Sequence, residues 1–218
     1  MIQETLVVGP FQCNCCILAC EETKEAVVID AGDEYDAISK RLRALGLTVK
    51  YSLHTHAHLD HIGAVHGLKA EHAAAKIALH ADDADIYRML PQQGQMFGFH
   101  YDAPPAIDVM LEDGQEISFG RHKCQVIHTP GHSPGGACFH FSGGELGTAP
   151  FLFSGDTLFH ESIGRTDLWG GDFGTLKKSI QGRLFTLEEE TAVQPGHGPR
   201  TSVGHERRKN PFVGDRVQ

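Results

Sequence analysis

The chain has no long hydrophobic run. Apolar residues make up 40% of its 218 residues, but no apolar stretch approaches the roughly 20 residues that a membrane-spanning helix requires. The N-terminal segment Met1–Leu6 also lacks the basic region and apolar stretch of a secretory signal peptide. We therefore expect a cytoplasmic protein that does not bind membranes.

Basic residues are scarce. The chain has 19 Lys and Arg against 28 Asp and Glu, which gives a net charge of −9. Nucleic-acid binding depends on clustered Lys and Arg, so we predict no nucleic-acid partner. The one dense basic run, Arg207–Lys209, is interpreted as a solvated helix end or tail, with capture of a substrate carboxylate as the alternative. The sequence predicts no particular oligomeric state.

The cysteines do not form a zinc-binding pattern, because no Cys-x-x-Cys pair is followed by a second one. Four of the six lie between Cys13 and Cys20. In a strand, Cys13 and Cys15 would face one side, and Cys16 and Cys20 the other. Because buried cysteine behaves as a small hydrophobe, we expect core packing for the Cys13–Cys20 cluster. A redox role or an additional metal site is the alternative.

Histidine, by contrast, is abundant, with 15 residues. The run from His56 to His61 contains four imidazole or carboxylate side chains, which are ligand types that zinc-like metals prefer. It lies between an expected strand, Thr48–Leu53, and a helical stretch that opens at His61, where α/β folds expose functional groups. An open catalytic zinc site needs about three protein ligands, so four candidates in one run indicate two metals.

Three later residues of the same chemical types, His132, Asp156 and His197, show the same placement. Each lies in a turn marked by Gly or Pro, just after a short β-prone segment. The alternative, a surface loop that is merely rich in histidine, does not account for this repeated placement.

With these residues, the chain resembles the metallo-β-lactamase superfamily, whose signature His-x-His-x-Asp-His is followed by a further His, Asp and His. Within that superfamily it is most similar to the short bacterial glyoxalase II group, which are hydroxyacylglutathione hydrolase-like proteins. The resemblance extends from about Asn14 to Phe212. It is supported by the strings Thr129–Ser133, Gly164–Asp167, Pro195–Pro199 and Glu206–Phe212.

The resemblance implies an α/β fold, the four-layer αββα metallo-β-lactamase sandwich, with the metal site at one edge of its two sheets. It also implies two divalent ions, most commonly zinc, with iron or manganese as alternatives. An aspartate at position 156 argues against antibiotic hydrolysis as the main activity, because the true β-lactamases of the superfamily do not have one there. The resemblance assigns one metal to His56, His58 and His132, the other to Asp60, His61 and His197, and a bridging role to Asp156.

We expect a single domain over residues 1–218, built from two similar halves that are each β-rich and then helical. Helices are predicted at 35–45, 61–75, 82–90 and 175–187. The segment 92–105 is predicted to be a long irregular loop. Full-length glyoxalase II enzymes carry a separate C-terminal helical domain that binds glutathione. None is expected here, since only residues 198–218 follow His197.

The predicted nucleophile is a metal-bound hydroxide, with Asp60 and Asp156 holding the catalytic metals. A thioester suits such a site because its leaving thiol, with a pKa of about 8.5, departs as a thiolate without a general acid. We therefore predict a thioester hydrolase of glyoxalase II type. Its expected partner is a small-molecule thioester, S-lactoylglutathione or a similar acyl-thioester.

Two alternatives belong to other classes. Persulfide dioxygenases share this fold, a similar ligand series and a Gly-Arg-Thr-Asp string like Gly164–Asp167, but they use a single iron. A non-enzymatic metal-binding module is the weaker alternative, because all seven ligand positions are filled.

Four further residues are candidates for supporting roles. Arg165 is placed to contact an anionic substrate, or alternatively to pair with Asp167. Phe97 lies in the predicted loop, which would act as a lid or pack across a sheet edge. Asp30 is a candidate support for a metal-binding turn. Strand alternation places His54 on the same side as His56.

Overall fold

The computed structural model describes residues 1–143 and 149–217. The chain divides into two compact units, one formed by Met1–Leu111 with Ser118–His122 and the other by Glu112–Ile117 with Lys123–Gln218. Across the residues described, no helix combines the length and apolar character needed to cross a membrane. The cytoplasmic location and the single domain over 1–218 stay predictions.

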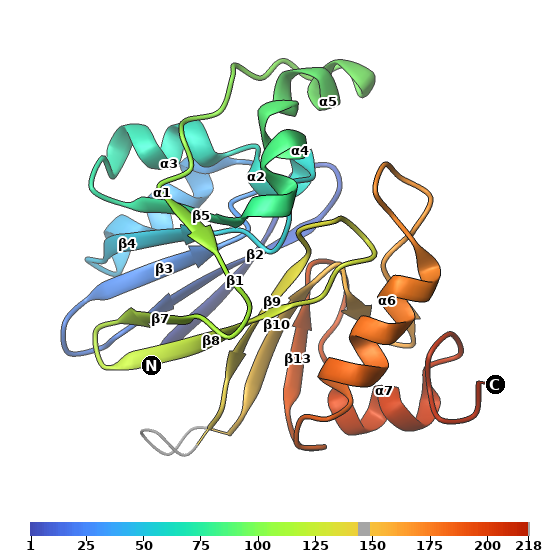
Figure 1. Ribbon diagram of the computed structural model, residues 1–218. Helices are drawn as coiled ribbons and strands as arrows, with labels where there is room; N and C mark the ends of the chain where they lie inside the picture. The colour runs from blue at the N-terminus through green and yellow to red at the C-terminus, as the bar shows by residue number, and fades with distance from the viewer. Residues whose placement is uncertain (144–148, 218) are drawn as a thin grey trace. The chain divides into compact units, whose positions relative to one another are not determined.

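The sheet of the first unit has the strand order β1-β2-β3-β4-β5-β6 (Figure 1). Its first three strands are antiparallel, whereas β3 to β6 are parallel. Because parallel strands end at the same edge, the turn that follows β4 projects from that edge. The strands are β1 (Ile2–Val8), β2 (Cys13–Ala19), β3 (Glu25–Ile29), β4 (Thr48–Leu53), β5 (Lys76–His80) and β6 (Val109–Leu111).

Helices α1 and α3 pack against this sheet. Cys13 and Cys15 of β2 belong to the same buried cluster as Ile38 and Leu42 of α1 and Leu68 of α3. All six cysteines of the chain are buried, which confirms the predicted core packing. The helices of the unit are α1 (Tyr35–Ala44), α2 (Leu59–Ile62), α3 (Val65–Glu71), the 3₁₀ turn η1 (Ala81–Asp83), α4 (Ala84–Arg88) and α5 (Leu90–Met96).

One helix prediction and one loop prediction for this unit are wrong in detail. The helix expected over 61–75 is two short helices, α2 and α3, and the second ends at Glu71. The segment 92–105 is not irregular throughout, because α5 extends to Met96. Pro91 lies in the first turn of α5, where its missing N–H has no intrahelical acceptor to lose. Gly94 gives α5 room to pack, since a Cβ there would lie 2.6 Å from the Tyr101 ring.

The second sheet has the order β14-β13-β10-β9-β8-β7. Strands β10 and β13 are parallel, whereas β9 is antiparallel to both β8 and β10. A separate hairpin, β11 and β12, follows β10 in the chain. The strands are β7 (Glu116–Phe119), β8 (His122–His128), β9 (Ala137–Phe141), β10 (Phe151–Gly155), β11 (Leu158–Phe159), β12 (Ser162–Ile163), β13 (Ala192–Pro195) and β14 (Thr201–Ser202).

The helices of the second unit are α6 (Phe173–Ser179), which continues into the π turn η3 (Ile180–Leu184), and α7 (Val203–Lys209). Figure 1 shows α6 and α7, in orange and red, beside β13. Their apolar residues share one buried cluster with Leu152 of β10 and Val193 of β13. The predicted helix over 175–187 is therefore confirmed in substance, although it begins at Phe173 and ends at Leu184. Arg207–Lys209 form the last turn of α7, as the helix-end interpretation predicted.

Candidate metal centre

The turn after β4 brings four predicted ligands of the first unit together. His58 immediately precedes α2, and Asp60 and His61 lie within that helix. The His56 ring lies 4.7 Å from the His58 ring and 4.0 Å from the His61 ring, between centroids. His61 Nε2 lies 3.7 Å from a carboxylate oxygen of Asp60. His56 and His61 are buried, whereas His58 and Asp60 are partly exposed.

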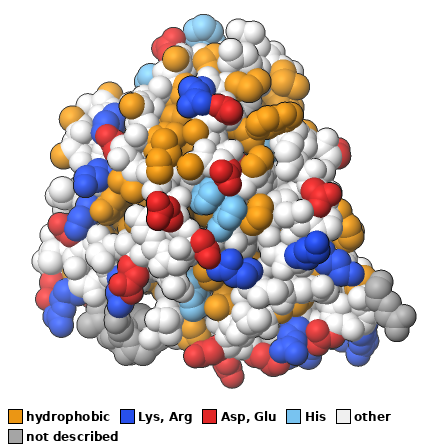
Figure 2. Space-filling view, viewed as in Figure 1, with side chains coloured by type: hydrophobic (Ala, Val, Ile, Leu, Met, Phe, Trp, Pro, Cys, Tyr) orange, Lys and Arg blue, Asp and Glu red, His pale blue; other side chains and the backbone are white. Residues whose placement is uncertain are grey.

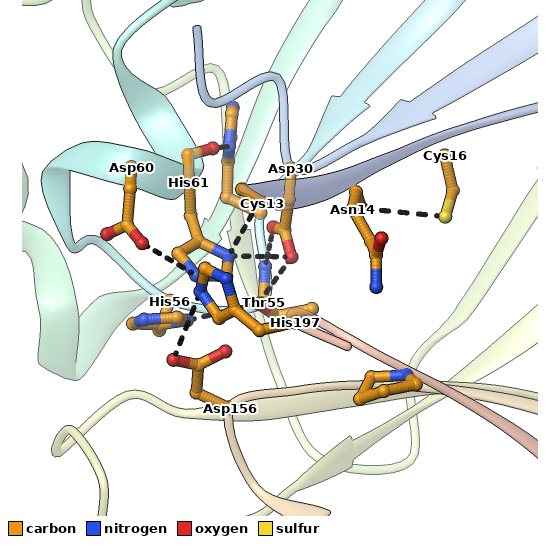
Figure 3. A network of polar contacts seen from close by, with 12 residues as sticks. Cys13, Asn14, Cys16, Asp30, Thr55, His56, Asp60, His61, Asp156 and His197 are labelled. Carbon is orange, nitrogen blue, oxygen red and sulfur yellow. Dashed lines mark hydrogen bonds and ion pairs between the residues drawn. The ribbon is translucent and has the colours of Figure 1, made fainter. Parts of the chain in front are cut away.

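Asp30, at the end of β3, orients the two buried histidines (Figure 3). Its Oδ2 lies 3.0 Å from His61 Nδ1 and accepts a 2.7 Å hydrogen bond from the Thr55 hydroxyl, while its Oδ1 accepts from the Thr55 N–H. Because a carboxylate only accepts, His61 Nδ1 carries the proton. The Thr55 hydroxyl donates its one hydrogen to Asp30, so its oxygen accepts a hydrogen bond from His56 Nδ1 at 3.1 Å. Both histidines thus keep Nε2 unprotonated, which is the form that binds a metal.

Asp30 itself adopts a left-handed backbone conformation, with φ of 54°. Asp adopts this region more readily than most residues that carry a side chain, so the backbone here suits an aspartate. The Asp30 N–H donates to the Leu53 carbonyl at 2.9 Å, which fixes the residue against the end of β4. The backbone of Asp30 is thereby held where its carboxylate contacts His61 and Thr55.

His54 and Cys13 contact His61 without adding charge. His54 Nδ1 donates to the His61 carbonyl at 3.0 Å, so its Nε2 accepts from the Ser52 hydroxyl at 3.0 Å. Burial lowers the pKa of His54, which keeps the ring neutral. Cys13 Sγ lies 3.6 Å from His61 Nδ1. Burial raises the pKa of the Cys13 thiol to about 11, so it stays protonated at neutral pH.

Two side chains that sequence reasoning missed brace the backbone of this turn. Asp83 accepts the Ala57 N–H at 2.9 Å. Gln93 of α5 accepts the Leu59 N–H at 3.0 Å and donates to the carbonyls of Ala57 and Ile86, at 3.0 Å and 2.9 Å. The partners lie 26 to 36 residues away along the chain from the turn, so no local sequence pattern reveals them.

We expect Gln93→Leu to lower the free energy of unfolding by about 1–3 kcal/mol, because it leaves the Leu59 N–H and the Ala57 carbonyl without their Gln93 partner. Gln92→Leu is the matched control, since Gln92 is exposed on the same helix. Urea unfolding measures the first effect, and zinc content after dialysis measures the expected loosening of the turn. Equal unfolding free energies for the two variants would contradict the bracing role.

In the second unit, Asp156 lies between two predicted histidine ligands. Its Oδ2 is 3.6 Å from both His132 Nε2 and His197 Nε2. His132 Nδ1 lies 2.8 Å from the carbonyl of Arg165, which can only accept, so this histidine also keeps Nε2 unprotonated. The unit therefore brings its three predicted ligands together, with both imidazoles directed at one carboxylate oxygen.

Strand ends and close backbone approach fix these positions. Asp156 follows β10 and His197 follows β13, which are parallel neighbours, and the Gly196 N–H donates to the Gly155 carbonyl at 2.8 Å. A Cβ at Gly164 would lie 1.8 Å from the Asp156 carbonyl oxygen. In the first unit, a Cβ at Gly32 would lie 1.7 Å from the Asp60 carbonyl oxygen. Each unit therefore needs a glycine beside its acidic ligand.

Arg165 forms a two-pronged ion pair within its own loop. Its Nε and Nη2 donate to the carboxylate of Asp167 at 2.7 Å and 2.8 Å, and this pairing lowers the pKa of Asp167 to about 2. The pair is the alternative arrangement that the sequence left open. Both side chains are exposed, so a role of Arg165 in substrate binding stays a prediction.

Phe97 lies just after α5 in an exposed aromatic group. Its side chain is 54% exposed, and its ring meets the edge of Phe11 at 5.2 Å between centroids. Phe99 lies 6.2 Å from the same Phe11 ring. Figure 2 shows hydrophobic side chains gathered over the part of the first unit that carries α4 and α5. Phe97 as a substrate contact stays a prediction, and sequence reasoning missed Phe11.

The chemistry of these donors suits borderline divalent metals. Unprotonated imidazole nitrogens combined with carboxylates are the ligands that zinc and iron accept. In His56, His61 and His132, the ring nitrogen that would face away from a metal is already hydrogen-bonded. Such outer hydrogen bonds fix the ring orientation and raise ligand basicity.

Comparison with known proteins shows which family this chain resembles. A family model described as the metallo-beta-lactamase superfamily matches residues 8–197. The hydroxyacylglutathione hydrolase GloC of Haemophilus influenzae is 35% identical, over 96% of this chain and 97% of its own length. The probable metallo-hydrolase YqgX of Bacillus subtilis is 37% identical, over 94% of both chains.

Solved structures agree in fold. The BLEG-1 B3 metallo-beta-lactamase superposes with a TM-score of 0.87 at 35% identity, covering 97% of this chain and 99% of that one. TTHA1623 in a di-iron-bound form gives 0.84 at 37% identity, covering 96% and 100%. ETHE1 from Myxococcus xanthus gives 0.82 at 27% identity, covering 100% and 86%. The predicted α/β metallo-β-lactamase fold is thereby confirmed.

Proposed function

Because the chain belongs to the metallo-β-lactamase superfamily, we propose that it is a thioesterase of glyoxalase II type, acting on S-lactoylglutathione or a similar acyl-thioester. The observation that carries the proposal is the match in length to the relative named hydroxyacylglutathione hydrolase, which extends over 97% of that relative. A relative of nearly the same length as this chain therefore carries that name. The coarser class of metal-binding hydrolase rests on the family as a whole.

The seven predicted ligands would hold two divalent ions. When bound, such ions supply hydroxide near neutral pH, by lowering the pKa of water to about 7, and polarise the carbonyl under attack. We assign one ion to His56, His58 and His132, the other to Asp60, His61 and His197, and a shared contact to Asp156.

The chain's own residues orient the candidate metal ligands. Asp30 and Thr55 keep His56 and His61 in the tautomer that leaves Nε2 for a metal. A thiol with a pKa of about 8.5 leaves as a thiolate, so no side chain has to protonate it. We further propose Phe97 as a contact for the apolar part of the substrate and Arg165 as a contact for a carboxylate of glutathione.

An iron-dependent persulfide dioxygenase is the second candidate. TTHA1623, which is 37% identical over 96% of this chain, was solved with two irons bound, so a close relative holds iron. Histidine and carboxylate ligands also accept iron. The fold is also similar to that of ETHE1, at 27% identity over the whole of this chain.

The test is steady-state hydrolysis of S-lactoylglutathione by protein whose metal content is determined on the same sample. We expect turnover that is lost on chelation and restored by zinc. The same preparation, loaded with iron, is assayed for oxygen consumption with glutathione persulfide. A β-lactam serves as the third substrate because of the likeness to BLEG-1. Negligible thioester turnover by fully metal-loaded protein would reject the proposal.

A further inference from the structure

A second group of metal-binding side chains lies in the second unit, apart from the seven residues above. His160 and Glu161 form the turn between β11 and β12, and His205 and Glu206 lie on α7. We infer that these four residues form a binding site for one borderline divalent cation such as zinc. The rings of His160 and His205 are stacked, with centroids 5.1 Å apart and planes 15° apart.

The donor atoms are close enough to share one ion. The ligand atoms of His160, His205 and Glu206 all lie within 4.8 Å of one another. His205 Nε2 lies 3.1 Å from Glu161 Oε1, which supplies a fourth ligand atom. The proton that joins these two atoms in the metal-free site is released when an ion binds between them. Zinc with bonds of about 2.0–2.2 Å places tetrahedral ligands about 3.3 Å apart, so side-chain movements of about 1–1.5 Å complete the site. His160 is exposed and can make this movement without losing packing.

The charge at this place also favours a cation. Glu206 is 0% exposed, and its carboxylate accepts hydrogen bonds from three uncharged groups. These are the Thr201 hydroxyl at 2.5 Å, the Glu161 N–H at 2.9 Å and the Asn210 side-chain amide at 2.8 Å. A buried carboxylate is costly unless a positive charge compensates it. His205 Nε2 lies 3.9 Å from Glu206 Oε1, so a cation bound by His205 would provide that charge.

The arginines next to Glu206 along α7 are engaged elsewhere. Arg207 pairs with Asp215 at 3.3 Å, and Arg208 pairs with Glu189 at 2.6 Å. Glu206 already ties the β11–β12 turn to α7 through the Glu161 N–H. An ion bound by His160 and His205 would add a second connection between the β11–β12 turn and α7. We therefore expect this ion to stabilise the fold and to take no part in catalysis.

The test is a calorimetric titration of zinc into protein already loaded at its seven-residue centre. We expect the wild type to bind one further zinc, and His160→Ala to bind it roughly tenfold or more weakly, because one of few ligands is lost. The matched control is His100→Ala, since His100 is a histidine whose side chain is 92% exposed in the first unit. Its zinc binding should equal that of the wild type.

Electron paramagnetic resonance with copper as the probe identifies the donors. We expect coupling to two imidazole nitrogens in the wild type and to one in His160→Ala. His205→Ala tests the ligand that α7 contributes to the same ion. If His205→Ala does not fold, the zinc binding of His160→Ala alone decides the test. Uptake of no further zinc by the wild type, or equal uptake by His160→Ala, would overturn the inference. Hydrolysis by His160→Ala should match the wild type, which separates this site from the proposed function.

Discussion

Replacing Asp156 by alanine is expected to weaken metal binding and thioester hydrolysis together. Asp156 Oδ2 lies 3.6 Å from both His132 Nε2 and His197 Nε2, and we assign these histidines to different metals. Without the carboxylate, the two imidazoles keep their places but the negative charge between them is lost. A metal ion contributes several kcal/mol to the transition state, so kcat/KM should fall by on the order of 10³-fold.

Metal content by mass spectrometry and kcat/KM, measured on the same samples, check this expectation. Asp102→Ala is the control, since the Asp102 side chain is 85% exposed and belongs to the other unit. Asp156→Asn keeps the shape of the side chain and should fold even if the alanine variant does not. Full activity with normal metal content in either Asp156 variant would refute the bridging role.

The positions of the candidate ligands were predictable from sequence because their signals are local. A strand of alternating or apolar residues, a Gly or Pro turn and one imidazole or carboxylate occur within about ten residues of one another. The structure places His132, Asp156 and His197 directly after β8, β10 and β13 or in the turns that follow. The family resemblance and its α/β fold are likewise confirmed.

The supporting residues were not predictable for the opposite reason. Asp83 and Gln93 bond to the backbone of the turn from positions more than 25 residues further along the chain. Their role depends on where α5 packs, and most of α5 lies in the segment 92–105, which was expected to be an irregular loop. The hairpin of β11 and β12 has only two residues per strand, which is too short to show the period-two pattern of a strand.

Asp30 differs from these residues, because its place before Gly32 at a strand end singled it out from the sequence. The structure adds that it acts on two histidines at once, directly on His61 and through the Thr55 hydroxyl on His56. A carboxylate is the only common side chain that accepts from both His61 Nδ1 and the Thr55 hydroxyl while also accepting the Thr55 N–H. This explains why an aspartate occupies the position.

Asp30→Asn is therefore expected to weaken metal binding by roughly 10–100-fold, although the side chain keeps its size. Its Oδ1 still accepts the Thr55 N–H, which turns the amide nitrogen toward His61 Nδ1. That nitrogen donates, so His61 Nδ1 loses its proton and Nε2 gains it, which blocks the metal-binding lone pair. A wrong tautomer of this kind has a larger effect on activity than on folding.

The side-chain nitrogen resonances of His61, recorded by NMR on metal-free protein, report the tautomer directly. We expect the proton on Nδ1 in the wild type and on Nε2 in Asp30→Asn, together with the loss of metal affinity. Asp36→Asn, at an exposed position in the first turn of α1, should change neither quantity. A purely structural role of Asp30 would lower stability without moving the proton. An unchanged His61 tautomer would therefore contradict the orienting role, even if the variant lost metal.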